Sequence, residues 1–165
     1  MQTILHAGCG NSPLPKWLGG KEVRLDIDPE VNPDIVASLT DLGEIGLFDM
    51  IWCSHTIEHL YPKELRIALK EFHRVLRPGG VLIALVPDLE DVRPTEEIVY
   101  ESSAGPVSGI DMFYGYRPWV ETNPYMAHHN GFVSETLTKA LLQAGFAGAK
   151  TSKVEVYNLM GVAVK

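Results

Sequence analysis

Ile4-Leu5-His6-Ala7-Gly8-Cys9-Gly10 is an apolar run that ends in a glycine turn, and eighteen residues past Gly8 a second apolar run ends in Asp26. A glycine turn lets the backbone approach a nucleotide cofactor closely, and an acid about 20 residues further on can hold both ribose hydroxyls. In open α/β sheets both features project beyond the carboxyl ends of the strands. The pattern therefore predicts a cofactor site, with a simple tight turn and Asp26 as a loop cap as the alternative.

Further apolar runs bounded by turn residues predict a series of strands along the chain. Between two of them, apolar residues at helical spacing predict a helix that starts at Pro62 and is stopped by Pro78-Gly79-Gly80. Strands that alternate with crossovers predict a doubly wound, mostly parallel α/β sheet with helices on both faces, formed by a single domain over residues 1–165. The predicted strands of the first half are Thr3–Ala7, Glu22–Leu25, Ile35–Leu39, Phe48–Cys53 and Val81–Val86.

Composition narrows the possible partners. The 165 residues carry a formal net charge of −7, so bulk nucleic acid is a poor partner. No apolar run approaches the length of a membrane span, and the N-terminus lacks the basic and apolar regions of a signal peptide. Cys9 and Cys53 form no metal-binding or redox pair, so both are expected to be reduced thiols. We therefore expect a cytoplasmic protein with no membrane partner.

The first crossover, from Asn11 to Glu22, discriminates between cofactors. It is only twelve residues long, so we expect one or two helical turns around Pro15–Leu18 and no full helix. A dinucleotide fingerprint requires a third glycine at position 13, which is Pro13, and a helix N-terminus that binds the pyrophosphate. A nicotinamide-dependent oxidoreductase is therefore the weaker alternative. S-adenosylmethionine, which has no phosphates, fits this crossover better.

The segment Leu89–Gly131 is long for a loop in a compact domain and rich in aromatic residues, which predicts a lid over the site. It shows weak helical character only around Thr95–Ser102. Tyr114, Tyr116 and Trp119 favour an apolar or ring-bearing ligand, unless they only pack over the sheet edge, and Arg117 is available for a carboxylate or phosphate. Beyond the segment, Ser134 predicts the cap of a helix that ends at Gly145, and two strands follow, roughly Ala149–Val154 and Tyr157–Val164.

Five blocks of the sequence form an ordered set. The first is the glycine turn already quoted. The others are Val23-Arg24-Leu25-Asp26-Ile27-Asp28-Pro29, the stretch from Phe48 to Leu60 with Ser54-His55 and Ile57-Glu58-His59, Phe72-His73-Arg74-Val75-Leu76-Arg77-Pro78-Gly79-Gly80-Val81-Leu82, and the run from His129-Asn130-Gly131-Phe132 to Ala144-Gly145-Phe146. In this order, the blocks resemble the class I S-adenosylmethionine-dependent methyltransferases of the type 11 branch. The resemblance implies an enzyme that methylates a small-molecule acceptor, and strand order 3-2-1-4-5-7-6 with strand seven antiparallel.

The resemblance also implies roles for individual residues. His6 and Ser38 stand where the family usually has acids that contact the cofactor. If their replacement weakens cofactor binding, the alternative is a non-catalytic module that binds the cofactor or a partner on the same fold. In the family, the glycine turn faces the methionine part of the cofactor and Asp26 would hold the ribose. Ile27 and Leu39 would lie beside the adenine, and Ser54 beside the sulfonium. The full set of expected cofactor-binding residues is His6, Ala7, Gly8, Gly10, Asp26, Ile27, Ser38, Leu39 and Ser54.

Methyl transfer requires alignment of the acceptor and, for a hydroxyl or amine, removal of a proton. Histidine titrates near neutral pH and suits that role. We expect His55 and His129 as the catalytic candidates, with His59 and His128 as further ones. His55 and His59 have i, i+4 spacing, but no glutamate directly follows His55 as in the metalloprotease motif, so no metal site is predicted.

Overall fold

The computed structural model describes residues 1–165 and is built on one seven-stranded sheet. Its strands are β1 (Thr3–Ala7), β2 (Lys21–Asp26), β3 (Ile35–Val36), β4 (Phe48–Ser54), β5 (Leu76–Pro87), β8 (Gly148–Val154) and β9 (Asn158–Val164). The order across the sheet is β3-β2-β1-β4-β5-β9-β8, and β9 runs antiparallel to both neighbours. Counted along the chain within this sheet, that is 3-2-1-4-5-7-6 with the seventh strand antiparallel, which confirms the predicted order.

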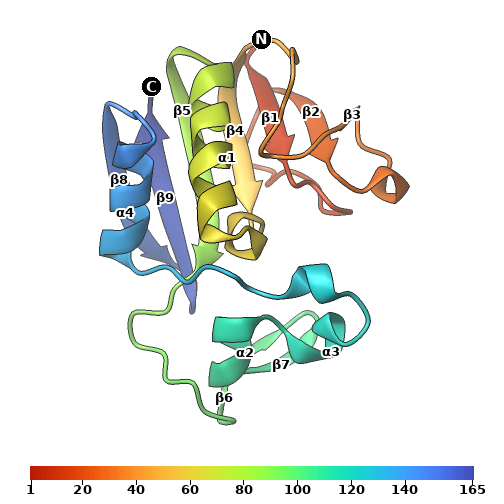
Figure 1. Ribbon diagram of the computed structural model, residues 1–165, viewed down its shortest axis with the longest axis vertical. Helices are drawn as coiled ribbons and strands as arrows, with labels where there is room; N and C mark the ends of the chain where they lie inside the picture. The colour runs from red at the N-terminus through yellow and green to blue at the C-terminus, as the bar shows by residue number, and fades with distance from the viewer.

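Both long helices cover one face of the sheet. The predicted helix from Pro62 is α1 (Pro62–Val75), and α4 (Ser134–Gln143) packs beside it (Figure 1). Their apolar faces close a core of 24 buried residues that includes Leu69 and Phe72 of α1 and Leu137 and Leu141 of α4. Burial of each such side chain contributes about 1.5–3 kcal/mol, so this face holds most of the hydrophobic stabilisation.

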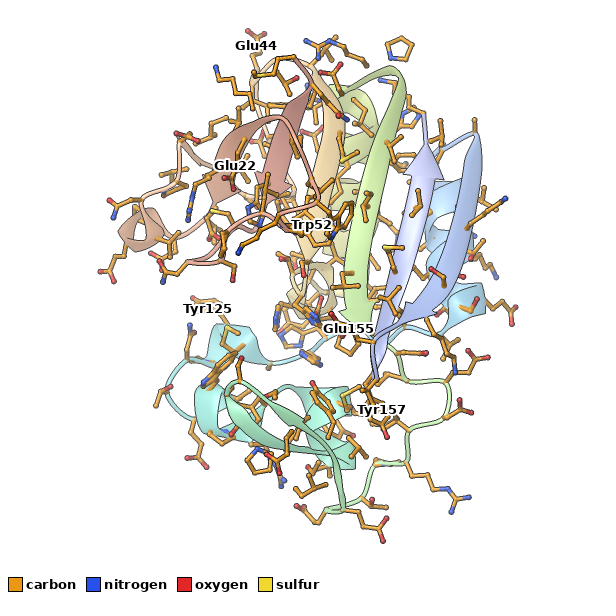
Figure 2. The ribbon with its side chains drawn as sticks, turned by 180° about the vertical axis from the view of Figure 1, so that it is seen from behind. Glu22, Glu44, Trp52, Tyr125, Glu155 and Tyr157 are labelled. Carbon is orange, nitrogen blue, oxygen red and sulfur yellow. The ribbon has the colours of Figure 1, made fainter.

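The prediction of helices on both faces is wrong, because no helix crosses the opposite face (Figure 2). A small cluster of Ile4, Trp52 and Ile83 lies there. Leu14 and Leu18 of the first crossover pack against it, and Trp17 makes an edge contact with Trp52, with ring centroids 5.9 Å apart. The covering segment forms a single hydrogen-bonded turn, from the Leu18 amide to the Pro15 carbonyl, and no helix. Two prolines and two glycines in so short a crossover account for this outcome.

Three predicted boundaries differ from the structure. β3 stops at Val36 instead of Leu39, because Ser38 turns the chain by accepting the Thr40 amide on its hydroxyl. α1 ends at Val75, and Pro78-Gly79-Gly80 lies inside β5 instead of capping the helix. Ser134 is the first residue of α4, and Val133 is its N-cap.

Residues 89–131 form a small separate layer beyond the carboxyl ends of β1, β4 and β5 (Figure 1). The weak helix predicted around Thr95–Ser102 is wrong. The segment is an antiparallel hairpin of β6 (Ile98–Ser102) and β7 (Gly105–Ser108), because Gly105 at φ 130° makes the turn and the apolar residues Ile98, Val99 and Tyr100 favour a strand. The hairpin leads into α2 (Gly109–Tyr114), α3 (Arg117–Val120) and a 3₁₀ turn at Pro124–Met126.

No helix of the structure combines the length and the apolar character required to cross a membrane.

Candidate functional site at the carboxyl ends of the strands

The glycine turn after β1 has a left-handed backbone at both glycines, which favours glycine there. Gly8 and Gly10 have φ of 67° and 48°, and the Gly8 amide donates to the Leu25 carbonyl at the end of β2, 2.8 Å away. A Cβ at Gly8 would collide with the Thr56 side chain, which follows β4. The turn therefore packs closely between the end of β2 and the residues that follow β4. Neither Gly8 nor Gly10 has a side chain that would keep a cofactor away from the backbone.

Asp26 lies directly against this turn. One carboxylate oxygen accepts the Gly10 amide at 2.8 Å, and the other accepts the Asp28 amide at 3.0 Å. A carboxylate can accept about four hydrogen bonds, so half of its capacity remains for a ligand. The structure thus brings together Gly8, Gly10 and Asp26, the three residues on which the sequence argument rests.

The residues expected beside the adenine are placed in two different environments. Ile27 is 69% exposed next to Asp26, so it offers an apolar surface at the strand edge, whereas Leu39 is 8% exposed and belongs to the core. Ser38 is half-buried, and its hydroxyl lies 2.8 Å from that of Thr40.

His6 lies on the helix-free face of the sheet. It pairs in register with Trp52, and its Nδ1 lies 2.7 Å from a carboxylate oxygen of Glu22 on β2, which Figure 2 shows on that face. Burial lowers the pKa of His6 more than Glu22 raises it, so the ring is neutral at neutral pH and donates its Nδ1 hydrogen to Glu22. Ala7 is fully buried in the core. His6 therefore uses its side chain for a structural pair with Glu22.

Ser54 ends β4, and His55 follows it in a left-handed backbone conformation, with φ of 49°. Such strain in a residue other than glycine costs about 1–3 kcal/mol and persists where the surrounding contacts hold it in place. The amide of His55 donates to the Leu85 carbonyl at 2.8 Å, and its Nδ1 lies 3.3 Å from Oε1 of Glu58. Burial opposes protonation of His55, but Glu58 outweighs it and raises the pKa of the imidazole.

Glu58 is 1% exposed, and neither carboxylate oxygen accepts a hydrogen bond. Burial opposes ionisation of Glu58, but His55 outweighs it, so the pKa of the carboxyl is lowered. Glu58 therefore remains charged at neutral pH inside the protein. The sequence analysis named Glu58 only as part of the block Ile57-Glu58-His59, and its position directly before His59 was the one signal that could have marked it.

The end of the 89–131 segment is bonded to this turn. The amides of His129 and Asn130 both donate to the Glu58 carbonyl, at 2.8 and 3.0 Å. The Nδ1 of His59 lies 3.1 Å from the Ala127 carbonyl. These bonds bring His128 beside His59, with ring centroids 5.1 Å apart.

Of the predicted catalytic pair, only His55 lies in this group of titratable side chains. The ring of His129 stacks on Tyr61 at a centroid distance of 4.0 Å, whereas its neighbour His128 contacts His59. Sequence reasoning did not separate the two adjacent histidines.

Arg117 is paired on both sides, so the expectation that it is available for a ligand is wrong. Its guanidinium donates to Asp111 at 2.7 Å and to Glu96 at 3.0 and 2.7 Å. These bonds connect α2 and α3 to the stretch before β6. Among the aromatic residues, Tyr114 is 63% and Trp119 is 49% exposed.

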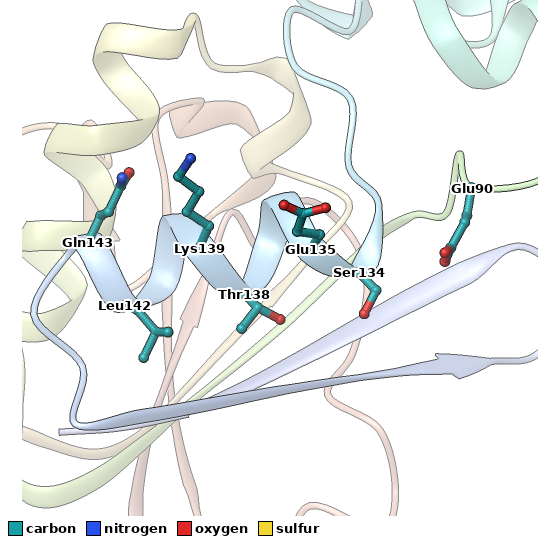
Figure 3. Close-up of a pocket in the computed structure, with 7 residues that line it drawn as sticks. All are labelled: Glu90, Ser134, Glu135, Thr138, Lys139, Leu142 and Gln143. Atoms are coloured by element: carbon teal, nitrogen blue, oxygen red, sulfur yellow. The ribbon is translucent and has the colours of Figure 1, made fainter.

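One pocket lies away from these residues. It has a volume of about 710 Å³, and its lining residues lie on α4 and at Glu90 (Figure 3). None of the predicted site residues lines it, and six of its seven lining residues are polar: Glu90, Ser134, Glu135, Thr138, Lys139, Leu142 and Gln143.

Comparison with known proteins agrees with this geometry. The family model described as a methyltransferase domain, type 11, matches residues 5–84, the part that contains the glycine turn, Asp26 and His55. The family match and the strand order both show that the chain is similar to the class I S-adenosylmethionine-dependent methyltransferases of the type 11 branch. No curated protein sequence matches it.

Solved structures share the fold at low identity. A methyltransferase from Archaeoglobus fulgidus has a TM-score of 0.69 at 15% identity, over 99% of this chain and 86% of its own. The 1,6-didemethyltoxoflavin-N1-methyltransferase of Burkholderia thailandensis, solved with 1,6-didemethyltoxoflavin and S-adenosylhomocysteine, has a TM-score of 0.68 at 15% identity, over 99% and 71%. The N-methyltransferase NodS of Bradyrhizobium japonicum, solved with S-adenosylhomocysteine, has a TM-score of 0.63 at 15% identity, over 99% and 78%.

Proposed function

We propose that this chain binds S-adenosylmethionine at the carboxyl ends of β1, β2 and β4 and transfers its methyl group to a small molecule. The observation that carries the proposal is the 2.8 Å bond from the Gly10 amide to Asp26, which joins the glycine turn and the acid into one surface. In this reading Asp26 holds the ribose hydroxyls, Gly8 and Gly10 face the methionine part, and the exposed Ile27 contacts the adenine.

The reaction requires little chemistry from the protein. The acceptor oxygen or nitrogen attacks the sulfonium methyl in line, the carbon–sulfur bond breaks with its electrons going to sulfur, and S-adenosylhomocysteine leaves. A hydroxyl or amine acceptor also loses a proton. His55 lies directly after Ser54 at the end of β4 and is 43% exposed, so it is placed to take that proton. His129, whose ring stacks on Tyr61, stays a second candidate for this role.

The 89–131 segment faces the same strand ends and is proposed to cover the acceptor as a lid, with residues 1–165 acting as one domain. Its exposed aromatic residues favour an apolar or ring-bearing acceptor. The Burkholderia thailandensis neighbour is an N1-methyltransferase of 1,6-didemethyltoxoflavin, which supports a small-molecule acceptor.

A second function is favoured by one observation. The family's usual acid is replaced by His6, whose side chain pairs with Glu22, so the chain could be a module that binds the cofactor or a partner without turnover. A nicotinamide-dependent oxidoreductase is disfavoured further, because the first crossover has no helix whose N-terminus could bind a pyrophosphate.

Titration calorimetry with S-adenosylmethionine, S-adenosylhomocysteine and NAD tests the proposal. We expect 1:1 binding of the first two and none of NAD. Asp26→Ala should weaken binding at least about 100-fold, since a buried ligand hydroxyl then loses a charged acceptor. Asp28→Ala is the matched control, because the Asp28 carboxylate accepts only the Glu30 amide. NAD binding in place of S-adenosylmethionine, or equal loss in both variants, would overturn the proposal.

A further inference from the structure

Glu58, His59 and His128 place one possible metal-ligand atom each within 4.8 Å of the others, although His128 lies 69 residues further along the chain. We propose that these three residues bind a divalent transition metal of the zinc class. Two imidazoles and one carboxylate form the donor set of catalytic zinc and non-haem iron sites, in which a remaining position is open to water or substrate.

The hydrogen bonds of the two imidazoles leave the correct nitrogen free. Nδ1 of His59 lies 3.1 Å from the Ala127 carbonyl, and Nδ1 of His128 lies 3.0 Å from the Met112 carbonyl. A carbonyl only accepts, so each Nδ1 carries the hydrogen and each Nε2 carries a free lone pair in the neutral ring. Metal-bound histidines almost always donate their other N–H in this way, since that bond fixes the ring orientation.

The carboxylate of Glu58 supplies an independent indication. It is 1% exposed, and neither oxygen accepts a hydrogen bond of regular geometry; the nearest donor atom is Nδ1 of His55, 3.3 Å from Oε1. Burial of a carboxylate with so few partners is costly, and a bound cation offsets that cost. His55, with Nδ1 3.3 Å from Oε1, is positioned to orient the carboxylate from the other side.

The backbone holds the three ligands in place before any metal arrives. The Glu58 carbonyl accepts the amides of His129 and Asn130, and the His128 amide donates to the Tyr114 carbonyl at 3.1 Å. Ligand atoms around tetrahedral zinc lie about 3.3 Å apart, so small side-chain rotations are enough to close the site. The cluster lies beyond the end of β4. If the proposed methyl transfer is correct, the open position would take the acceptor's oxygen or nitrogen.

Metal content and affinity of the tag-free, chelator-treated protein test the site. After incubation with excess Zn²⁺ and desalting, we expect one equivalent of Zn²⁺ by elemental analysis, and visible absorption typical of low coordination number when Co²⁺ is added in its place. His59→Asn and His128→Asn keep an amide nitrogen at the Nδ1 position but remove Nε2. Each should weaken Zn²⁺ binding at least about 100-fold in competition with a chromophoric chelator. His129→Asn, at the adjacent position, should bind like the parent.

A parent protein that binds less than one equivalent of Zn²⁺ overturns the site, whatever the variants do. Equal binding by the parent and both Asn variants overturns the ligand assignment, as does an equal loss in His129→Asn. Glu58→Gln gives a second variant if either Asn variant unfolds. S-adenosylmethionine binding is measured in parallel. Asp26→Ala should keep the metal and His128→Asn should keep the cofactor, so failure of one site is distinguishable from failure of the other.

Discussion

His6 and Glu22 are joined across neighbouring strands, with Nδ1 2.7 Å from a carboxylate oxygen, on the face of the sheet that carries no helix. This pair occupies the position at which the family usually has an acid. The imidazole therefore contributes to the joint between β1 and β2 and presents no charge to the glycine turn.

We predict that His6→Ala changes S-adenosylmethionine affinity less than about threefold, a difference below about 0.7 kcal/mol, since the ring is paired with Glu22. It should instead destabilise the fold, because a 2% exposed side chain is lost and Glu22 loses its partner. Calorimetry and urea unfolding separate the two effects. A loss of affinity as large as that of Asp26→Ala would show that His6 contacts the cofactor.

Gly8→Ala should destabilise the protein by about 3 kcal/mol, because a left-handed backbone costs about 1–2 kcal/mol and the collision with Thr56 adds to it. Gly43→Ala is the control, since Gly43 also has a positive φ, 60°, but has open space around its Cβ position. We expect only about 1–2 kcal/mol there. Equal destabilisation in urea titrations would mean that the close approach of Thr56 is unimportant.

The Asp111–Arg117 pair predicts a decline of stability in acid. Burial opposes ionisation of Asp111, but Arg117 and Ser108 outweigh it and lower its pKa from 3.8 to about 2. A carboxyl with a lowered folded-state pKa stabilises the fold above its unfolded value, and this stabilisation is lost as pH falls from about 4 to 2. The loss is at most about 2 kcal/mol. Asp111→Asn should be less stable at pH 6 and show a smaller decline between pH 6 and pH 2.5. An identical decline in both proteins would assign the acid sensitivity to other groups.

Arg117→Ala should loosen the 89–131 segment more than the sheet, because Arg117 connects α2 to Glu96 before the hairpin. Hydrogen exchange resolved by peptide should speed up in α2 and β7 and stay unchanged in β4 and β5. Uniform acceleration along the chain would indicate that the segment and the sheet unfold as one unit.

The sheet could be predicted from the sequence because apolar runs and turn residues act locally. The existence of β1 to β5, the start of α1 at Pro62, and the closeness of Gly8, Gly10 and Asp26 followed from spacing within 30 residues. Features that depend on contacts distant along the chain could not be predicted, such as the joining of His128 to Glu58. The helix-free face was missed because the first crossover is too short and too rich in proline and glycine to form a helix. The β6–β7 hairpin was missed because its turn residues, and not the weak helical pattern, decide the local structure.

The most direct test of the central claim is a crystal structure of the protein with S-adenosylhomocysteine. We predict that the ribose hydroxyls bind the Asp26 carboxylate, that the methionine part lies over Gly8 and Gly10, and that the sulfur faces Ser54 and His55. Ligand bound anywhere else, or a site that stays without ligand at saturating concentration, would contradict the assignment of this strand edge as a methyltransferase site.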